Sequence, residues 1–354
     1  MTRSIWAWVR MLGGASIIAV LVWRLGSGAF LDGLRVIDAG DVLAAFLIGL
    51  ATTLLSAWRW CLVARGLGLR LPFRGAVADY YKALFLNAAL PGGVLGDVDR
   101  AVQHGRDSGD VGRGVRAVVL ERTAGQIVLV SVGLVVLLTV PSPVLSHLGR
   151  LGPAAGVAAL TAAAVAAVAF VVWVRLRRGT SKVASAARTG VAEIRTGLLA
   201  RRTWPGIVLA SAVVLAGHLA TFMVAARAAG STASLLRLAP LMLLALLAMS
   251  LPVNIGGWGP REGVTAWAFG AAGLSASQGL TIAVAYGLFA FVAALPGAAV
   301  LIARAMSRMR AARIAPVSPA VVLFTAADPI AIPPNAAEPI AVPHGVRALA
   351  HQGA

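Results

Sequence analysis

Apolar runs long enough to cross a bilayer constrain the fold of this 354-residue chain more than any other feature. A membrane-spanning helix takes about 20 mainly apolar residues, and backbone in lipid must form its hydrogen bonds internally. Hydrophobic residues make up 59% of the sequence and charged residues only 12%. We predict full spans near residues 5–25, 41–63, 117–140, 153–174, 205–229 and 278–303. The sequence therefore predicts an all-α, polytopic membrane protein.

Two further apolar segments, at about 76–100 and 235–273, each contain a motif that should break a helix. The first reads Leu-Pro-Gly-Gly-Val-Leu-Gly-Asp from residue 90, and the second reads Leu-Pro-Val-Asn-Ile-Gly-Gly-Trp-Gly-Pro-Arg-Glu from residue 251. Proline and glycine interrupt helices, and such backbone is tolerated at membrane depth where protein or a cavity satisfies it. We expect two re-entrant or broken helical hairpins.

The distribution of basic residues predicts the orientation of the chain. Arginine and lysine are richest in the segments 59–82, 100–116, 175–202 and 304–313. These segments share one side only if both hairpins return to the side from which they enter. The positive-inside rule then places both termini in the cytoplasm, and we expect the plasma membrane.

The same order of elements predicts an inverted repeat. Each half, at about 5–140 and 153–305, contains two spans, a hairpin and a span, in opposite orientations. Such repeats place a substrate site between the halves, near the midplane. We expect residues 1–313 to form this transmembrane domain. The proline- and alanine-rich segment 314–354 is predicted to be a disordered cytoplasmic tail.

Several functional classes are disfavoured by the sequence. The net charge of +18 would suggest nucleic acid for a soluble protein, but here the basic residues suit topology and anionic lipid headgroups. Cys61 is the single cysteine, and the histidines show no metal-ligand spacing, so we expect no metal and no cofactor. No nucleotide-binding loop is present, and we favour a protein that is not an enzyme.

The first candidate site follows the first break. Arg100 is expected to pair with a lipid phosphate, because a guanidinium group matches phosphate geometry. Asp97 or Asp99 would hold that arginine or exchange with the phosphate. The alternative is a loop salt bridge that only anchors the hairpin.

The second candidate site follows the second break. Arg261 and Glu262 should open a short helix with Pro260 in its first turn, which gives an anion site at a helix N-terminus. The alternative is an internal cap formed by these two residues. Glu121 and Arg122, at the start of a span, either snorkel to the interface or close the polar network of the first hairpin. Supporting roles are expected for Asn87, Asn254, Gly92, Gly93, Gly96, Gly256 and Gly257.

The motif from Asn87 to Arg100, the Glu121–Arg122 pair and the motif from Pro252 to Glu262 resemble the lysylphosphatidylglycerol synthase transmembrane-region family. This resemblance implies a flippase-like membrane domain that binds lipids and moves them between leaflets. The named synthases carry a further aminoacyl-transfer domain. We identify none in this sequence, and we expect that the chain does not itself make lysylphosphatidylglycerol. One departure from the family pattern is Val94-Leu95 before Gly96.

Three functional hypotheses follow. The first is a lipid translocase that binds an anionic phospholipid or a polyprenyl-phosphate-linked headgroup between the two hairpins. The second is a membrane-embedded enzyme that modifies a lipid or a lipid-linked sugar, with Asp97, Asp99 and Glu262 as acid or base groups. The third is an accessory subunit of a cell-envelope glycosyltransferase. We expect a membrane lipid as partner, with a cell-envelope enzyme as a further one, and no nucleic acid.

Overall fold

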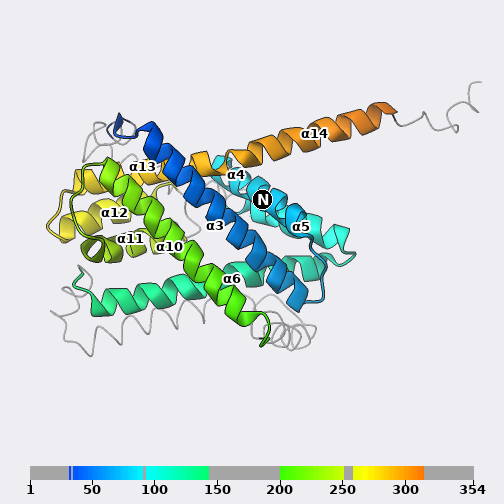
Figure 1. Cartoon of the computed structure of the whole chain (residues 1–354), viewed down its shortest axis with the longest axis horizontal. Helices are drawn as coiled ribbons and strands as arrows, with labels where there is room; N and C mark the ends of the chain where they lie inside the picture. The colour runs from blue at the N-terminus through cyan, green and yellow to red at the C-terminus, as the bar shows by residue number, and fades with distance from the viewer. Residues whose placement is uncertain (1–31, 33–34, 91–92, 143–199, 251–257, 315–354) are drawn as a thin grey trace, which may run out of the picture. The chain divides into compact units, whose positions relative to one another are not determined.

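The computed structural model describes residues 32, 35–90, 93–142, 200–250 and 258–314. The elements there are α-helices, labelled in Figure 1. The predicted spans near 5–25 and 153–174 lie outside the described residues, as does the predicted tail from residue 315 onward. By its internal contacts the chain divides into two units, 1–305 and 306–354. The candidate site belongs to the first unit.

Four predicted spans correspond to helices that are long and apolar enough to cross a membrane. These are α3 (Ala39–Gly66), α6 (Val111–Thr139), α10 (Trp204–Ala228) and the stretch Ala276–Ser307, which contains α13 (Ala276–Ala294) and the first part of α14 (Pro296–Ile314). Pro296 lies where α13 gives way to α14, as expected for a residue that lacks a backbone N–H. The chain is therefore a multi-pass membrane protein.

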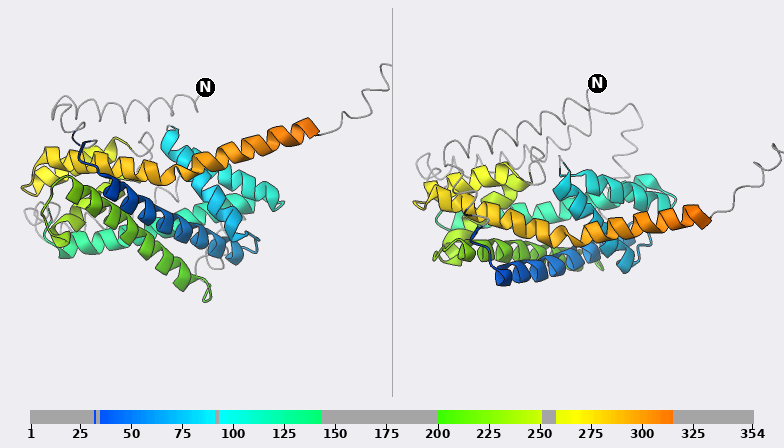
Figure 2. Two further views of the ribbon diagram at one scale, coloured as in Figure 1. Left: turned by 45° about the horizontal axis from the view of Figure 1, so that its top comes forward. Right: turned by 90° about the horizontal axis from the view of Figure 1, so that it is seen from above.

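Both predicted breaks are present as pairs of short helices. The first pair is α4 (Phe73–Ala89) with α5 (Leu95–Asp107), and the second is α11 (Leu235–Met249) with α12 (Pro260–Ala271). The two helices of each pair pack against each other, and α3 and α10 lie side by side in Figures 1 and 2. In both parts of the chain, a long helix is followed by a short pair and then by another long helix.

The first pair depends on a close backbone approach. A Cβ atom on Gly96 would lie 2.1 Å from the carbonyl oxygen of Ala83, so only glycine fits where α5 meets α4. The Gly96 N–H donates to Asn87 Oδ1 at 2.8 Å. Gly93 has φ +60°, a left-handed conformation that glycine adopts without strain. The close approach of α5 to α4 at Gly96 thus occurs with Val94 and Leu95 in place.

The second pair opens as predicted. Pro260 is the first residue of α12, and Gly259 before it has φ +107°. The Gly259 N–H donates to Glu262 Oε2 at 2.7 Å, which satisfies one of the N–H groups left unpaired at a helix start. Glu262 therefore caps its own helix as well as binding Arg261.

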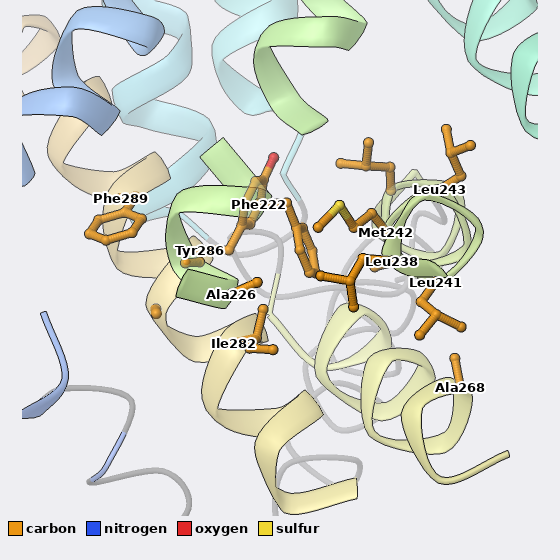
Figure 3. Packing of buried hydrophobic residues seen from close by; sticks show 14 of the residues in the cluster. Phe222, Ala226, Leu238, Leu241, Met242, Leu243, Ala268, Ile282, Tyr286 and Phe289 are labelled. Carbon is orange, nitrogen blue, oxygen red and sulfur yellow. The ribbon is translucent and has the colours of Figure 1, made fainter. Parts of the chain in front are cut away.

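A buried apolar cluster joins the second pair to the long helices around it. Figure 3 shows Phe222 of α10, Met242 of α11, Ala268 of α12 and Ile282 of α13 in this cluster. The rings of Phe222 and Tyr286 lie 5.0 Å apart, centroid to centroid. This packing fixes α11 and α12 against α10 and α13.

Several polar residues are buried within helices. Arg59 and Lys82, which lie in the basic segment 59–82 used to predict the orientation, are buried within α3 and α4. Tyr80 and Tyr81 are buried in α4, and His104 is buried in α5. Arg59 and Tyr80 bind Glu121 of α6, and Lys82 pairs with Asp99 of α5. Two residues of this basic segment therefore do not lie in a loop.

Candidate functional site

A cavity of about 360 Å³ lies among α3, α4, α6, α10 and α13 and reaches the start of α12. This volume is at the lower end of the range for ligand pockets, about 300–1,000 Å³. Its lining includes Arg59, Arg122, Arg261 and His218. No carboxylate lines it within the described residues, and the undescribed stretches at the two breaks, 91–92 and 251–257, contain none in the sequence. The lining is therefore suited to an anion.

Glu121 lies on α6, behind the arginines that line the cavity, and it connects α6 to three other helices. Its Oε1 accepts hydrogen bonds from Arg59 Nε at 3.0 Å, Arg59 Nη2 at 2.5 Å and the Tyr80 hydroxyl at 3.2 Å. Its Oε2 accepts from Arg100 Nη2 at 2.7 Å. Glu121 is fully buried, so it does not snorkel to the interface. It closes the polar network of the first hairpin, one of the two alternatives left by the sequence.

Arg100 is held in an aromatic cage formed by Trp60 and Tyr80. Its guanidinium carbon lies 4.6 Å from the Trp60 ring centroid and 4.4 Å from that of Tyr80. Asp97 Oδ1 accepts from Arg100 Nε at 3.0 Å. Arg100 is fully buried and is not part of the cavity lining. The structure thus places this predicted phosphate ligand behind the wall, where it positions Glu121 and Asp97.

Asp97 connects Arg100 with a second arginine that does line the cavity. Asp97 Oδ2 accepts from Arg122 Nη2 at 2.5 Å and from Asn87 Nδ2 at 2.9 Å. Arg122 Nε is buried and has no hydrogen-bond partner among the described residues. Arg122 therefore has donor capacity that Asp97 does not use.

Asp99 belongs to a separate polar cluster. Its carboxylate lies 2.6 Å from Lys82 Nζ, and Lys82 also donates to Gln103 Oε1 at 2.5 Å. Nearby, Arg304 Nη1 donates to Asp79 at 2.6 Å. None of these five residues lines the cavity. The structure does not bring Asp99 to Arg100, contrary to one of the sequence expectations.

Arg261, in the second half of the chain, is held by a carboxylate and two aromatic rings as Arg100 is, but Arg261 lines the cavity. Its Nε donates to Glu262 Oε1 at 2.9 Å, and its Nη2 donates to the same oxygen. Its guanidinium carbon lies 5.0 Å from the Trp258 ring and 5.3 Å from the Tyr286 ring. A Cβ atom on Gly287 would lie 2.3 Å from Arg261 Nη2, so this glycine makes room for the guanidinium.

The cavity also contains residues that the sequence did not single out as site residues. Arg59 donates to Ser211 Oγ at 3.0 Å, and His218 Nδ1 lies 3.0 Å from the Tyr286 hydroxyl. The sequence could have indicated Arg59 and His218, because both lie within predicted apolar spans, and polar groups at membrane depth are costly and usually functional.

Four predicted supporting residues, Asn254, Gly92, Gly256 and Gly257, lie outside the described residues. Among the residues that the structure describes, no group of three or more histidine, cysteine or acidic side chains has the geometry of a metal site.

The chain matches the family described as Lysylphosphatidylglycerol synthase TM region over residues 8–297. The chain belongs to this family. The membership confirms the resemblance seen in the motifs and marks the protein as a membrane protein associated with lipids. A comparison with curated proteins finds no match.

Proposed function

We propose that this family member is a lipid translocase that holds an anionic lipid headgroup in the central cavity. The observation that carries the proposal is the lining, which has three arginines and no carboxylate among its described residues. Guanidinium groups donate paired hydrogen bonds that match phosphate oxygens, and they keep their charge at any physiological pH. An anionic headgroup would replace the water that otherwise solvates these donors.

The carboxylates behind the wall would position the arginines. Glu121 orients Arg59, Asp97 orients Arg122, and Glu262 orients Arg261. Each of these guanidinium groups then reaches the cavity from a fixed direction. In this proposal Arg122 and Arg261 contact the phosphate directly.

Translocation would use the two short helical pairs. The repeated order of long helix, short pair and long helix supports an inverted repeat, in which α4–α5 and α11–α12 gate opposite sides of the cavity. The acyl chains would remain in lipid while the headgroup passes through. We place the protein in the plasma membrane with both termini in the cytoplasm, and we expect a cell-envelope enzyme to supply or consume the lipid.

The enzyme hypothesis is less well supported by this geometry. Its acid or base groups would be Asp97, Asp99 and Glu262. Each of these carboxylates already pairs with an arginine or lysine side chain. None of the three lines the cavity. A general base must lie within hydrogen-bond reach of the proton that it removes, so we favour binding and transport over chemistry.

A binding measurement tests the proposal. The purified chain in nanodiscs would be titrated with an acyl-labelled anionic phospholipid, beside an Arg122→Gln variant and an Arg113→Gln control. Arg113 is exposed and pairs with Asp110 away from the cavity. We expect Arg122→Gln to weaken binding about tenfold, which is about 1.4 kcal/mol, and Arg113→Gln to leave it unchanged. Equal affinity of all three proteins for the lipid would contradict headgroup binding in the cavity.

A further inference from the structure

We infer that the cavity selects a phosphodiester lipid whose headgroup carries hydroxyl groups and no positive charge. This inference rests on the proposed function and names its substrate class. It follows from two independent observations, the balance of charge among the described residues around the cavity and the direction in which the lining hydroxyl groups donate.

Among the described residues, the charge balance around the cavity leaves one positive charge. Four guanidinium groups, three in the lining and Arg100 behind it, interact with three carboxylates. The carboxylates are Asp97, Glu121 and Glu262. Charges that are partly enclosed by protein are screened less than charges at the open surface, and a phosphodiester carries one negative charge. A phosphodiester headgroup would therefore neutralise the set, whereas a diphosphate-linked carrier would bring excess negative charge.

The lining threonines already use their protons within their own helices. Thr52 Oγ1 donates to the carbonyl oxygen of Gly49 at 3.0 Å, and Thr221 Oγ1 donates to that of Gly217 at 3.0 Å. Both residues line the cavity. A hydroxyl group has one donor and two acceptor lone pairs, so these threonines offer acceptors to a ligand. The matching headgroup must supply donors, as the hydroxyl groups of a glycerol or sugar do.

An ammonium group also donates hydrogen bonds, but the charge of the lining opposes it. Among the residues that the structure describes, three guanidinium groups and no carboxylate face the cavity, so a cationic headgroup would meet like charge. Choline has no donor for the threonines at all. The cavity therefore rejects a lysyl ester, although lysylphosphatidylglycerol gives the family its name. Repulsion of this kind is how a site discriminates between related ligands.

Competition among four lipids with matched acyl chains tests the inference on the full chain in nanodiscs. The competitors are phosphatidylglycerol, phosphatidylmethanol, phosphatidylcholine and lysylphosphatidylglycerol, each displacing an acyl-labelled phosphatidylglycerol. Phosphatidylmethanol keeps the phosphodiester charge and lacks the hydroxyl groups. We expect phosphatidylglycerol to bind about tenfold more tightly than its lysyl ester and about fivefold more tightly than phosphatidylmethanol. Equal displacement by the lysyl ester, or by phosphatidylmethanol, would overturn the inference.

A double variant, Thr52→Val with Thr221→Val, isolates the hydroxyl recognition. It should reduce the preference for phosphatidylglycerol over phosphatidylmethanol to less than about twofold and leave the rejection of the lysyl ester intact. The control is Thr139→Val, since Thr139 donates to the Val135 carbonyl oxygen in the same way but is exposed and outside the cavity. A preference that survives the double variant would contradict the assignment of these threonines.

Further measurements distinguish failure of this inference from failure of the proposed function. Free glycerol 3-phosphate at millimolar concentration should not displace the labelled lipid, and full displacement would identify a soluble phosphate ester as the ligand and overturn the inference. If no labelled lipid binds at all, the proposed function fails together with the inference. If all four lipids bind equally well, only the inference fails.

Discussion

Glu121 Oε2 accepts a hydrogen bond from Arg100 Nη2 at 2.7 Å, and both side chains are fully buried. Glu121 belongs to the long helix α6, and Arg100 belongs to the short helix α5 after the first break. Because Glu121 also binds Arg59 of α3, one carboxylate fastens the first hairpin to two long helices. The site is thus held by buried charge as well as by apolar packing.

Replacing this carboxylate should destabilise the fold. Glu121→Gln leaves Arg59 and Arg100 buried without their shared counter-charge, and removal of one partner from a buried ion pair costs about 3–5 kcal/mol. A large fall in the melting temperature of the detergent-purified protein is the expected result. Asp107→Asn, at an exposed position in α5, serves as the control and should melt like the wild type. Equal melting of all three proteins would show that the pair does not stabilise the structure.

Asp97 both orients Arg122 and should compete with the phosphate for it, and we expect the competition to have the larger effect on binding. Asp97→Asn removes the negative charge 2.5 Å from Arg122 Nη2 and frees that guanidinium for the headgroup. We predict about tenfold tighter binding of an anionic phospholipid, with slower exchange between leaflets because release is slower.

The matched control for Asp97 is Asp99→Asn. Asp99 lies on the same helix, pairs with Lys82 and does not line the cavity. Weaker binding by Asp97→Asn, with Asp99→Asn unchanged, would instead indicate that Asp97 only orients Arg122.

Gly287 should be sensitive to a single methyl group. In Gly287→Ala the new Cβ atom would lie 2.3 Å from Arg261 Nη2 and 2.9 Å from the Trp258 ring, so the guanidinium must move. We expect headgroup binding to fall about tenfold in a lipid titration. Gly270→Ala is the control, because the nearest described atom to its Cβ would be that of Ala276 at 3.6 Å, an ordinary contact distance. Unchanged binding in Gly287→Ala would show that the observed position of Arg261 is not needed.

His104 should make the stability of the protein depend on pH. Burial lowers the pKa of His104, although Asp107 and Asp79 oppose this effect. The folded state then binds the proton less readily than the unfolded state, whose histidine has a pKa of about 6.5. Stability is fully present above that pH and is lost as the pH falls below it. The melting temperatures at pH 7.5 and 5.5 should differ less for His104→Gln than for the wild type. An equal difference in both proteins would show that His104 does not contribute to the pH dependence of stability.

The sequence predicted the frame of the fold because apolar length and helix-breaking residues act locally. The spans represented by α3, α6, α10 and α13 follow from runs of apolar residues, and the ends of α4 and α11 follow from proline and glycine. The opening of α12 at Pro260 follows from the same local rules. The helix pairs could therefore be anticipated without knowledge of their packing.

The site was predicted only in part because its contacts join distant segments. Arg59 meets Glu121 from 62 residues away and Ser211 from 152 residues away, and no local pattern shows either pairing. Arg100 and Arg122 each follow a carboxylate residue in the sequence, Asp99 and Glu121, yet packing buries the first and exposes the second to the cavity. Which arginine faces a ligand is decided by the tertiary arrangement of α5 and α6.

The most direct test of the central claim is a leaflet assay in liposomes. Wild type and Arg122→Gln would be reconstituted at equal density with a headgroup-labelled anionic phospholipid, and the label in the outer leaflet would be quenched chemically. Arg122→Gln is chosen because Asp97 keeps Arg100 and Asn87 as partners. We predict that wild type exposes the inner-leaflet label over time and that the variant does so much more slowly. Quenching limited to the outer leaflet in both proteins, or equally fast exchange in both, would contradict translocation through the cavity.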